Sequence, residues 1–220
     1  MTRLHAVLGV VGILAVVAPM SGARASLLFD NLGQSKGGAA PVTSPLYSSF
    51  STGSQSLNLG NVTLQMIATT PGDLGSVRVT LLADSVGTPG KGLAIVGYIA
   101  DSTLSSLYST PSLATVASAK TVSLLPNTRY WLELSNGVLG TSSSAYWEFA
   151  NTDAGLGVSS EFHENSANGS GVVANASSNS AYMMSVDPVP EPDSIAVLGV
   201  GLLGLALVWG SRGKKAGDKA

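Results

Sequence analysis

Residues 57–66 read LNLGNVTLQM, and this stretch decides the fold class. Its apolar side chains recur at every second position, which is the period of a strand with one face on a hydrophobic core. The alternation slips by one residue at Gly60-Asn61, where a bulge or a tight turn would return the second half to the same face. The stretch therefore predicts one long strand whose core residues are Leu57, Leu59, Val62, Leu64 and Met66.

Shorter alternating runs, separated by turn residues, fill the chain from Ser26 to about Asn179. The loop from Asp84 to Gly92 contains the turn signal Thr88-Pro89-Gly90. Eight or nine short strands in about 150 residues predict a mainly β domain, a two-sheet antiparallel β-sandwich of jelly-roll-like form. The further predicted strands include Val77-Val79-Leu81, Leu93 to Ala100, a strand closed by Leu124-Leu125-Pro126-Asn127, Tyr130-Leu132-Leu134, Ala145 to Ala150, Leu156 to Phe162 and Ala181 to Val186.

Composition excludes several classes of function. Between Ser26 and Asp187 ten acidic residues stand against five basic ones, a net charge of −5. Nucleic-acid binding needs a basic footprint, so it is disfavoured. The chain has no cysteine, which removes disulfides, thiolate nucleophiles and cysteine metal sites.

The first 25 residues have the pattern of a secretory signal peptide. Arg3 and His5 lie in a short polar start, and an apolar core runs from Ala6 to Ala18. The small residues Ala23 and Ala25 suit the two key subsites of signal peptidase, so cleavage is expected after Ala25. A core of about thirteen residues is short for a membrane span of roughly twenty. The segment is therefore predicted to be a signal-peptide helix that leaves the mature protein.

The other end of the chain reads as a membrane anchor behind a stiff linker. Residues 187–193 are rich in proline, and residues 194–211 are predicted to form a transmembrane helix. The apolar run from Ile195 to Gly210 would rise about 24 Å as a helix, somewhat less than the hydrocarbon thickness of a bilayer. The tail at 212–220 carries Arg212, Lys214 and Lys215, which mark its cytoplasmic side.

Pro190-Glu191-Pro192, the short apolar span and the basic end together resemble the PEP-CTERM sorting signal of Gram-negative bacteria. The resemblance implies that an exosortase recognises Pro190, Glu191 and Pro192 and processes the protein during export. It also implies that Arg212, Lys214 and Lys215 act as the stop-transfer signal. The protein would be anchored in the inner membrane before processing and would then reach the cell envelope or the exterior. Because PEP-CTERM systems accompany exopolysaccharide production, a role in biofilm is implied as well.

The β domain has a second resemblance, to the choice-of-anchor domains of bacterial surfaces and most closely to the type called R. It implies a surface β domain without an established activity, so no functional residues carry over. The resemblance covers most of the predicted domain at residues 26–186. It rests on the spacing of Leu28-Phe29-Asp30-Asn31-Leu32, Phe50-Ser51-Thr52-Gly53, the strand from Val77 to Leu82, the Pro89-Gly90 turn, and Tyr130-Trp131-Leu132-Glu133-Leu134 with Trp147.

Catalysis is hard to assemble from this sequence. His163 is the one imidazole expected in the mature chain, and Glu161 and Glu164 flank it, but an exposed polar loop is the simpler interpretation. No G-x-S-x-G elbow occurs. A glycosidase pair among the carboxylates stays open, because a sequence does not measure their separation. The G-x-G-x-x-G match at 199–204 lies in the apolar span and is read as small residues of a membrane helix.

Two binding chemistries remain as alternatives. Asp84 and Asp101 flank turns, and acidic loops on β-sandwiches bind calcium in some proteins. Trp131, Trp147 and Tyr146 would stack on sugar rings if they were exposed, although aromatic residues in strands more often fill the core. The leading prediction is a non-enzymatic exported envelope or matrix protein without a cofactor. The first alternative is a carbohydrate- or calcium-binding surface module, and the second is a secreted hydrolase.

Overall fold

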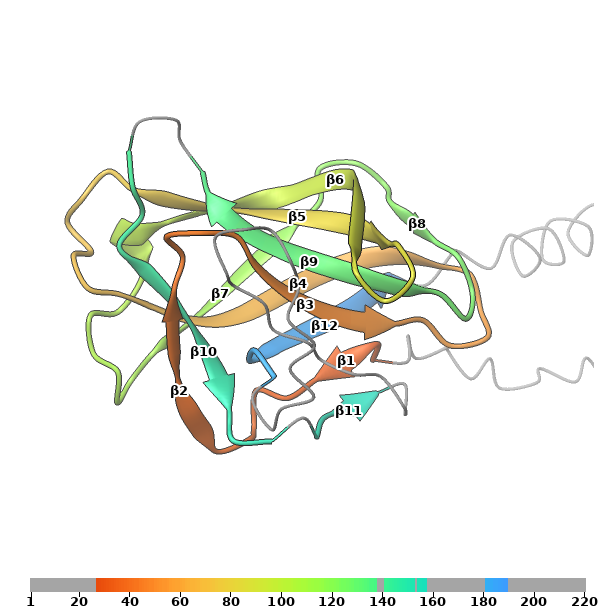
Figure 1. Ribbon diagram of the computed structural model, residues 1–220, viewed down its shortest axis with the longest axis horizontal. Helices are drawn as coiled ribbons and strands as arrows, with labels where there is room; N and C mark the ends of the chain where they lie inside the picture. Colours follow the sequence, from red (N-terminus) through yellow and green to blue (C-terminus); the bar gives the residue numbers. More distant parts are fainter. Residues whose placement is uncertain (1–26, 138–140, 153, 158–180, 190–220) are drawn as a thin grey trace, which may run out of the picture.

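The computed structural model describes residues 27–137, 141–152, 154–157 and 181–189, and these ranges are mainly β-strand (Figure 1). The strands form two antiparallel sheets, which confirms the predicted class. A single 3-10 helix, η1 (Asp101–Thr103), interrupts them among the described residues. No helix in these ranges has the length and hydropathy that a membrane span requires. The predicted helices at residues 1–25 and 194–211 lie outside the described residues.

The first sheet has eight strands, and the long strand β4 (Leu57–Ala68) lies at its centre. Along one path it runs β11 (Leu156–Gly157), β1 (Phe29–Asp30), β12 (Met184–Val189), β4, β10 (Ala145–Ala150) and β2 (Lys36–Pro41). Strands β7 (Ser112–Ala117) and β8 (Ser123–Leu124) also pair with β4.

Both edges of β4 are occupied. Val62 pairs with Val186 of β12 on one side and with Val116 of β7 on the other. Met66 pairs with Trp147 of β10 and with Ser112 of β7. Strands β12 and β10 therefore follow one another along the same edge of β4, and the sheet forks where they meet.

The predicted slip at Gly60-Asn61 is a β-bulge. Val62 pairs with Val186 and Leu59 with Pro188, so two residues of β4 oppose the single residue Asp187 of β12. Asn61 is exposed, while the predicted core residues on both sides of the bulge are buried. The bulge keeps both halves of β4 on the same core, as the alternation predicted.

The second sheet has four strands in the order β3 (Leu46–Ser51), β9 (Arg129–Asn136), β5 (Ser76–Asp84) and β6 (Pro89–Ala100). The tight turn of the β5–β6 hairpin lies earlier than predicted. Val86 and Gly87 hold its centre with φ of 55° and 79°, so Pro89 already belongs to β6. Two adjacent residues with positive φ give the twist that joins antiparallel strands tightly, and this backbone requirement overrides the Pro-Gly signal.

One hydrophobic core lies between the two sheets. Leu64 and Met66 of β4 are completely buried, as are Val79 and Leu81 of β5, and they belong to one cluster. From β9 the predicted face of Tyr130, Leu132 and Leu134 joins that cluster. Each sheet thus buries one apolar face against the other, which is the packing that the period-two alternation requires.

The last strand extends further than predicted. The sequence placed the end of the domain at Val186 and a linker from Asp187, whereas β12 continues to Val189, which pairs with Asn58. Pro188 is buried. Proline lacks a backbone donor, so within sheets it is found at edges and at bulges. Pro188 lies next to the bulge at Gly60-Asn61, where it is tolerated. The predicted accessible linker is therefore strand as far as Val189.

Candidate functional site

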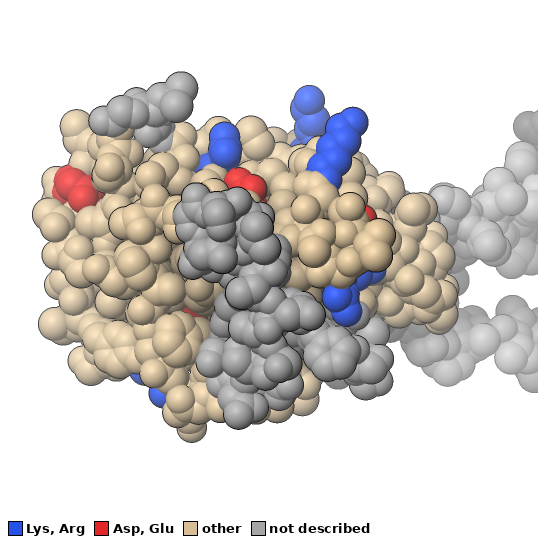
Figure 2. Space-filling view, viewed as in Figure 1, with Lys and Arg blue, Asp and Glu red and all other residues tan. Residues whose placement is uncertain are grey.

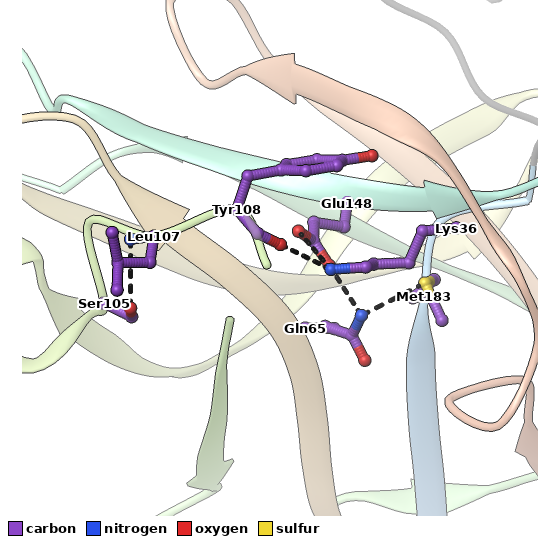
Figure 3. Close-up of polar contacts among 7 residues, drawn as sticks. All are labelled: Lys36, Gln65, Ser105, Leu107, Tyr108, Glu148 and Met183. Carbon is purple, nitrogen blue, oxygen red and sulfur yellow. Dashed lines mark hydrogen bonds and ion pairs between the residues drawn. The ribbon is translucent and has the colours of Figure 1, made fainter. Parts of the chain in front are cut away.

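A buried polar cluster lies at the fork of the first sheet, where β4, β10 and β12 meet. Its members are Lys36 at the start of β2, Gln65 in β4 and Glu148 in β10 (Figure 3). Strand alternation places Gln65 between the core residues Leu64 and Met66, so its side chain leaves the core face. Glu148 likewise follows the core residue Trp147, and its side chain is completely buried all the same.

The two oxygens of the Glu148 carboxylate contact different partners. Oε2 accepts a hydrogen bond of 2.6 Å from Nε2 of Gln65. Oε1 lies 3.6 Å from Nζ of Lys36, and it has no hydrogen-bond partner. Nε2 of Gln65 also lies 3.4 Å from the sulfur of Met183. Figure 3 shows the Lys36 amine and the Gln65 amide converging on this one carboxylate.

Lys36 also fastens the loop that precedes β7. Its ammonium donates to the backbone carbonyl of Tyr108 and lies 4.6 Å from the centre of the Tyr108 ring. The Lys36 side chain keeps 25% of its surface exposed, whereas Glu148 keeps none. A buried carboxylate is costly without a cation and hydrogen bonds, so Lys36 and Gln65 are the groups that make the burial of Glu148 tolerable.

The functional groups of this cluster are of the kinds that take part in proton transfer and acyl transfer. It brings together a primary amine, a carboxylate and a primary amide, in a place that excludes most water. It contains a single carboxylate, and nowhere do the described ranges gather three or more His, Asp or Glu side chains able to hold a metal.

The predicted calcium ligands Asp84 and Asp101 do not meet. They lie at opposite ends of the β5–β6 hairpin, since Asp84 pairs with Pro89 and Ser76 with Ala100. Asp84 fastens the hairpin turn by accepting a hydrogen bond from the backbone of Gly87. The structure therefore does not combine these two residues into one calcium site.

Asp101 is instead the centre of a second, structural cluster. It is completely buried and accepts hydrogen bonds from the hydroxyl of Ser143 and from the backbone and hydroxyl of Ser144. Asp73 lies nearby, and the backbone N–H of Gly75 holds the pKa of Asp73 below its usual range, with a further contribution from the Ser144 side chain. These bonds fasten the loops at one end of both sheets.

The two tryptophans are structural. Trp131 and Trp147 are completely buried, so they are not surface platforms for sugar rings. The indole of Trp131 donates to Asp84, and that of Trp147 donates to the carbonyl of Met183. Tyr146 is half-buried on the other face of β10. The alternative that aromatic residues of strands fill the protein interior holds for both tryptophans.

Several predicted sites lie outside the described residues. These are the signal-peptidase residues Ala23 and Ala25, the sorting residues Pro190, Glu191 and Pro192, the basic residues Arg212, Lys214 and Lys215, and the His163 group with Glu161 and Glu164. The sequence prediction missed the cluster of Lys36, Gln65 and Glu148. Its one local sign is a glutamate between Trp147 and Phe149 in an otherwise apolar strand.

Charged residues are sparse in this protein, where Asp, Glu, Lys and Arg make up 11% of the chain. Figure 2 shows a face that is mostly uncharged, with only a few Lys, Arg, Asp and Glu side chains. The whole chain has a formal net charge of −2. Neither observation favours an electrostatic partner such as nucleic acid.

Residues 188–212 match the family described as the PEP-CTERM protein-sorting motif. No curated protein is significantly similar to the chain. The matched segment begins at Pro188, inside β12, and includes the predicted sorting residues and the predicted membrane span. The motif is a substrate signal for exosortase, so the chain is an exported protein that passes through the membrane to the cell envelope.

Proposed function

We propose that this protein is a non-enzymatic component of the Gram-negative cell envelope or its extracellular matrix, delivered there by exosortase. Signal peptidase would remove residues 1–25, and exosortase would recognise Pro190-Glu191-Pro192 while residues 194–211 lie in the inner membrane. The observation that carries the proposal is the match at residues 188–212, the first two of which belong to the folded domain.

The place of β12 in the sheet supports this function. β12 lies between β1 and β4, and its last residue, Val189, pairs with Asn58 of the long central strand. β1 pairs with β12 at Ser185 and Val186, and the end of β12 next to the tail is held by its pairing with β4. Five residues lie between Val189 and Ile195, so the two are at most about 20 Å apart along an extended chain. The domain would therefore stay close to the membrane until the tail is processed.

The domain itself would act as a structural module associated with exopolysaccharide or biofilm. We assign it to the choice-of-anchor class with a jelly-roll-like sandwich, and we expect it to work without a cofactor. The sparse charge and the buried positions of Trp131, Trp147 and Asp101 support a role in assembly over small-ligand binding. The rival, a carbohydrate- or calcium-binding module, predicts retention on the producer's polysaccharide or a calcium-dependent rise in melting temperature.

Replacing Pro190, Glu191 and Pro192 together by alanine tests the sorting function. The expected result is a larger, unprocessed form that stays in the inner-membrane fraction, because the protease has lost its recognition motif. Asp193→Ala is the matched control, since it changes the next residue and keeps the motif. A triple variant with wild-type size and location on immunoblots of fractionated cells would refute the proposal.

A further inference from the structure

The fork of the first sheet contains the components of an amide-forming reaction. We propose that Lys36 and Gln65 become joined by an intramolecular amide bond, with Glu148 carrying the proton between them. The bond would be a covalent link between β2 and β4 across the intervening strand β10. It concerns the β domain alone and is independent of the sorting motif.

The two oxygens of Glu148 lie where the reaction needs them. Oε1 is 3.6 Å from Nζ of Lys36, the nucleophile, and Oε1 has no hydrogen-bond partner. Oε2 is 2.6 Å from Nε2 of Gln65, the nitrogen that would leave. One carboxylate thus contacts both the attacking and the departing nitrogen, which is the arrangement that general acid–base catalysis requires.

The reaction balances without any co-reactant. Glu148 takes a proton from the Lys36 ammonium, and the freed lone pair of Nζ attacks Cδ of Gln65. The new bond joins Nζ to Cδ. Glu148 then passes this proton, and afterwards the second proton that Nζ loses, to the departing nitrogen, so that the bond from Cδ to Nε2 breaks, Nζ keeps one hydrogen as an amide and an ammonium ion leaves. No atom is oxidised or reduced.

Burial favours this outcome over simple hydrolysis of the amide. Gln65 is only 7% exposed and Glu148 is completely buried, so water has little access to the carbonyl carbon. Lys36 is tethered beside them by its contacts with Tyr108, which raises the effective concentration of the amine. The chain has no cysteine, so such a bond would give an exported domain the cross-link that a disulfide supplies elsewhere.

Trypsin digestion of the denatured protein, recovered from the envelope of producing cells, tests the proposal. Lys36 is the only trypsin site between Arg24 and Arg78. The amide would block cleavage after Lys36, so one peptide should run through it to Arg78. Its mass should be lower than the sequence requires by about 17 Da, the mass of ammonia. Fragment ions should join Lys36 to Gln65.

Two variants show that the bond depends on these residues. Lys36→Arg keeps the charge and the trypsin site but supplies no ε-amine, and Glu148→Gln keeps the shape but carries no proton. Both should be cleaved after residue 36 and show no loss of mass. Complete cleavage after Lys36 in the wild-type chain would overturn the proposal whether or not the variants fold. A link from Lys36 to Glu148, with the loss of water, would overturn the assignment of Gln65 as the acyl partner.

Discussion

Replacing Gly60 by alanine is expected to destabilise the domain, because the bulge in β4 leaves no room for a side chain. A Cβ at this position would lie 2.6 Å from the carbonyl oxygen of Asp187 and 3.1 Å from the carbonyl carbon of Pro188. Both are backbone atoms of β12, so no side-chain rotation can relieve the contact. The bulge would have to open, or β12 would have to move away from β4.

The size of the effect follows from that distance. Ordinary contacts of a Cβ begin at 3.4 Å, so the strands must separate locally by 3.4 − 2.6 = 0.8 Å. Overpacking of this kind costs about 1–3 kcal/mol, while alanine returns about 0.4–1 kcal/mol by restricting the unfolded chain. The net loss is about 1–2 kcal/mol. For a domain of this size it corresponds to a fall in melting temperature of roughly 2–8 °C.

Gly72→Ala is the matched control for this substitution. A Cβ at Gly72 would have nothing within 4 Å, so only the effect on the unfolded chain remains. Thermal unfolding of the purified full chain, followed by circular dichroism, compares the two variants. We expect Gly72→Ala to leave the melting temperature unchanged or raise it slightly. Equal melting temperatures for the two variants would show that β12 does not approach Gly60 as closely as the structure indicates.

Two further predictions concern pH and backbone strain. Burial raises the pKa of Asp187 above its ordinary value, and the nearby carboxylate of Asp30 raises it further. A raised pKa favours the protonated form in the folded state, so the contribution of Asp187 to stability is present below its unfolded pKa of about 3.9 and is lost as pH rises through the folded value. Asp187→Asn should therefore raise the melting temperature more near pH 7 than near pH 3, and an equal shift at both would contradict this assignment. Val86 is 99% exposed and has φ of 55°, a conformation unfavourable for a β-branched residue. Val86→Asn would place an Asn-Gly pair in this turn, which is the preferred pair for it. We expect the melting temperature to rise by roughly 2–4 °C, which corresponds to about 1 kcal/mol. An unchanged or lower melting temperature would argue against a strained turn.

Strand positions were readable from the sequence because alternation is a local property. Strand β10 begins and ends where the pattern predicted, at Ala145 and Ala150, and the slip at Gly60-Asn61 predicted the bulge. Turn positions were less readable. In the β5–β6 hairpin the turn is centred on Val86 and Gly87 and not on Pro89-Gly90, because two adjacent positive φ angles match the twist of the flanking strands.

The candidate site was not readable in the same way. Gln65 and Glu148 are 83 positions apart, and nothing local marks either of them as the partner of the other. Trp131 and Trp147 illustrate the same limit, since an aromatic residue in a strand has the same sequence signature whether it faces the core or the solvent. Only the tertiary packing decided that both are buried, Trp147 as a member of the main core cluster and Trp131 outside it.

The sequence by itself determined the β class, the bulge in β4 and the sorting motif, because each of these depends on residues close together in the chain. The tertiary structure decided which strands pair. It thereby placed Lys36 and Gln65 against the carboxylate of Glu148, and it extended β12 to Val189, so that the strand overlaps the sorting motif, which begins at Pro188. The physical reason is that a period of two fixes which face of a strand is apolar but leaves its neighbours open. Which strands become neighbours depends on how whole apolar faces are buried against one another, and these faces come from segments far apart in the sequence.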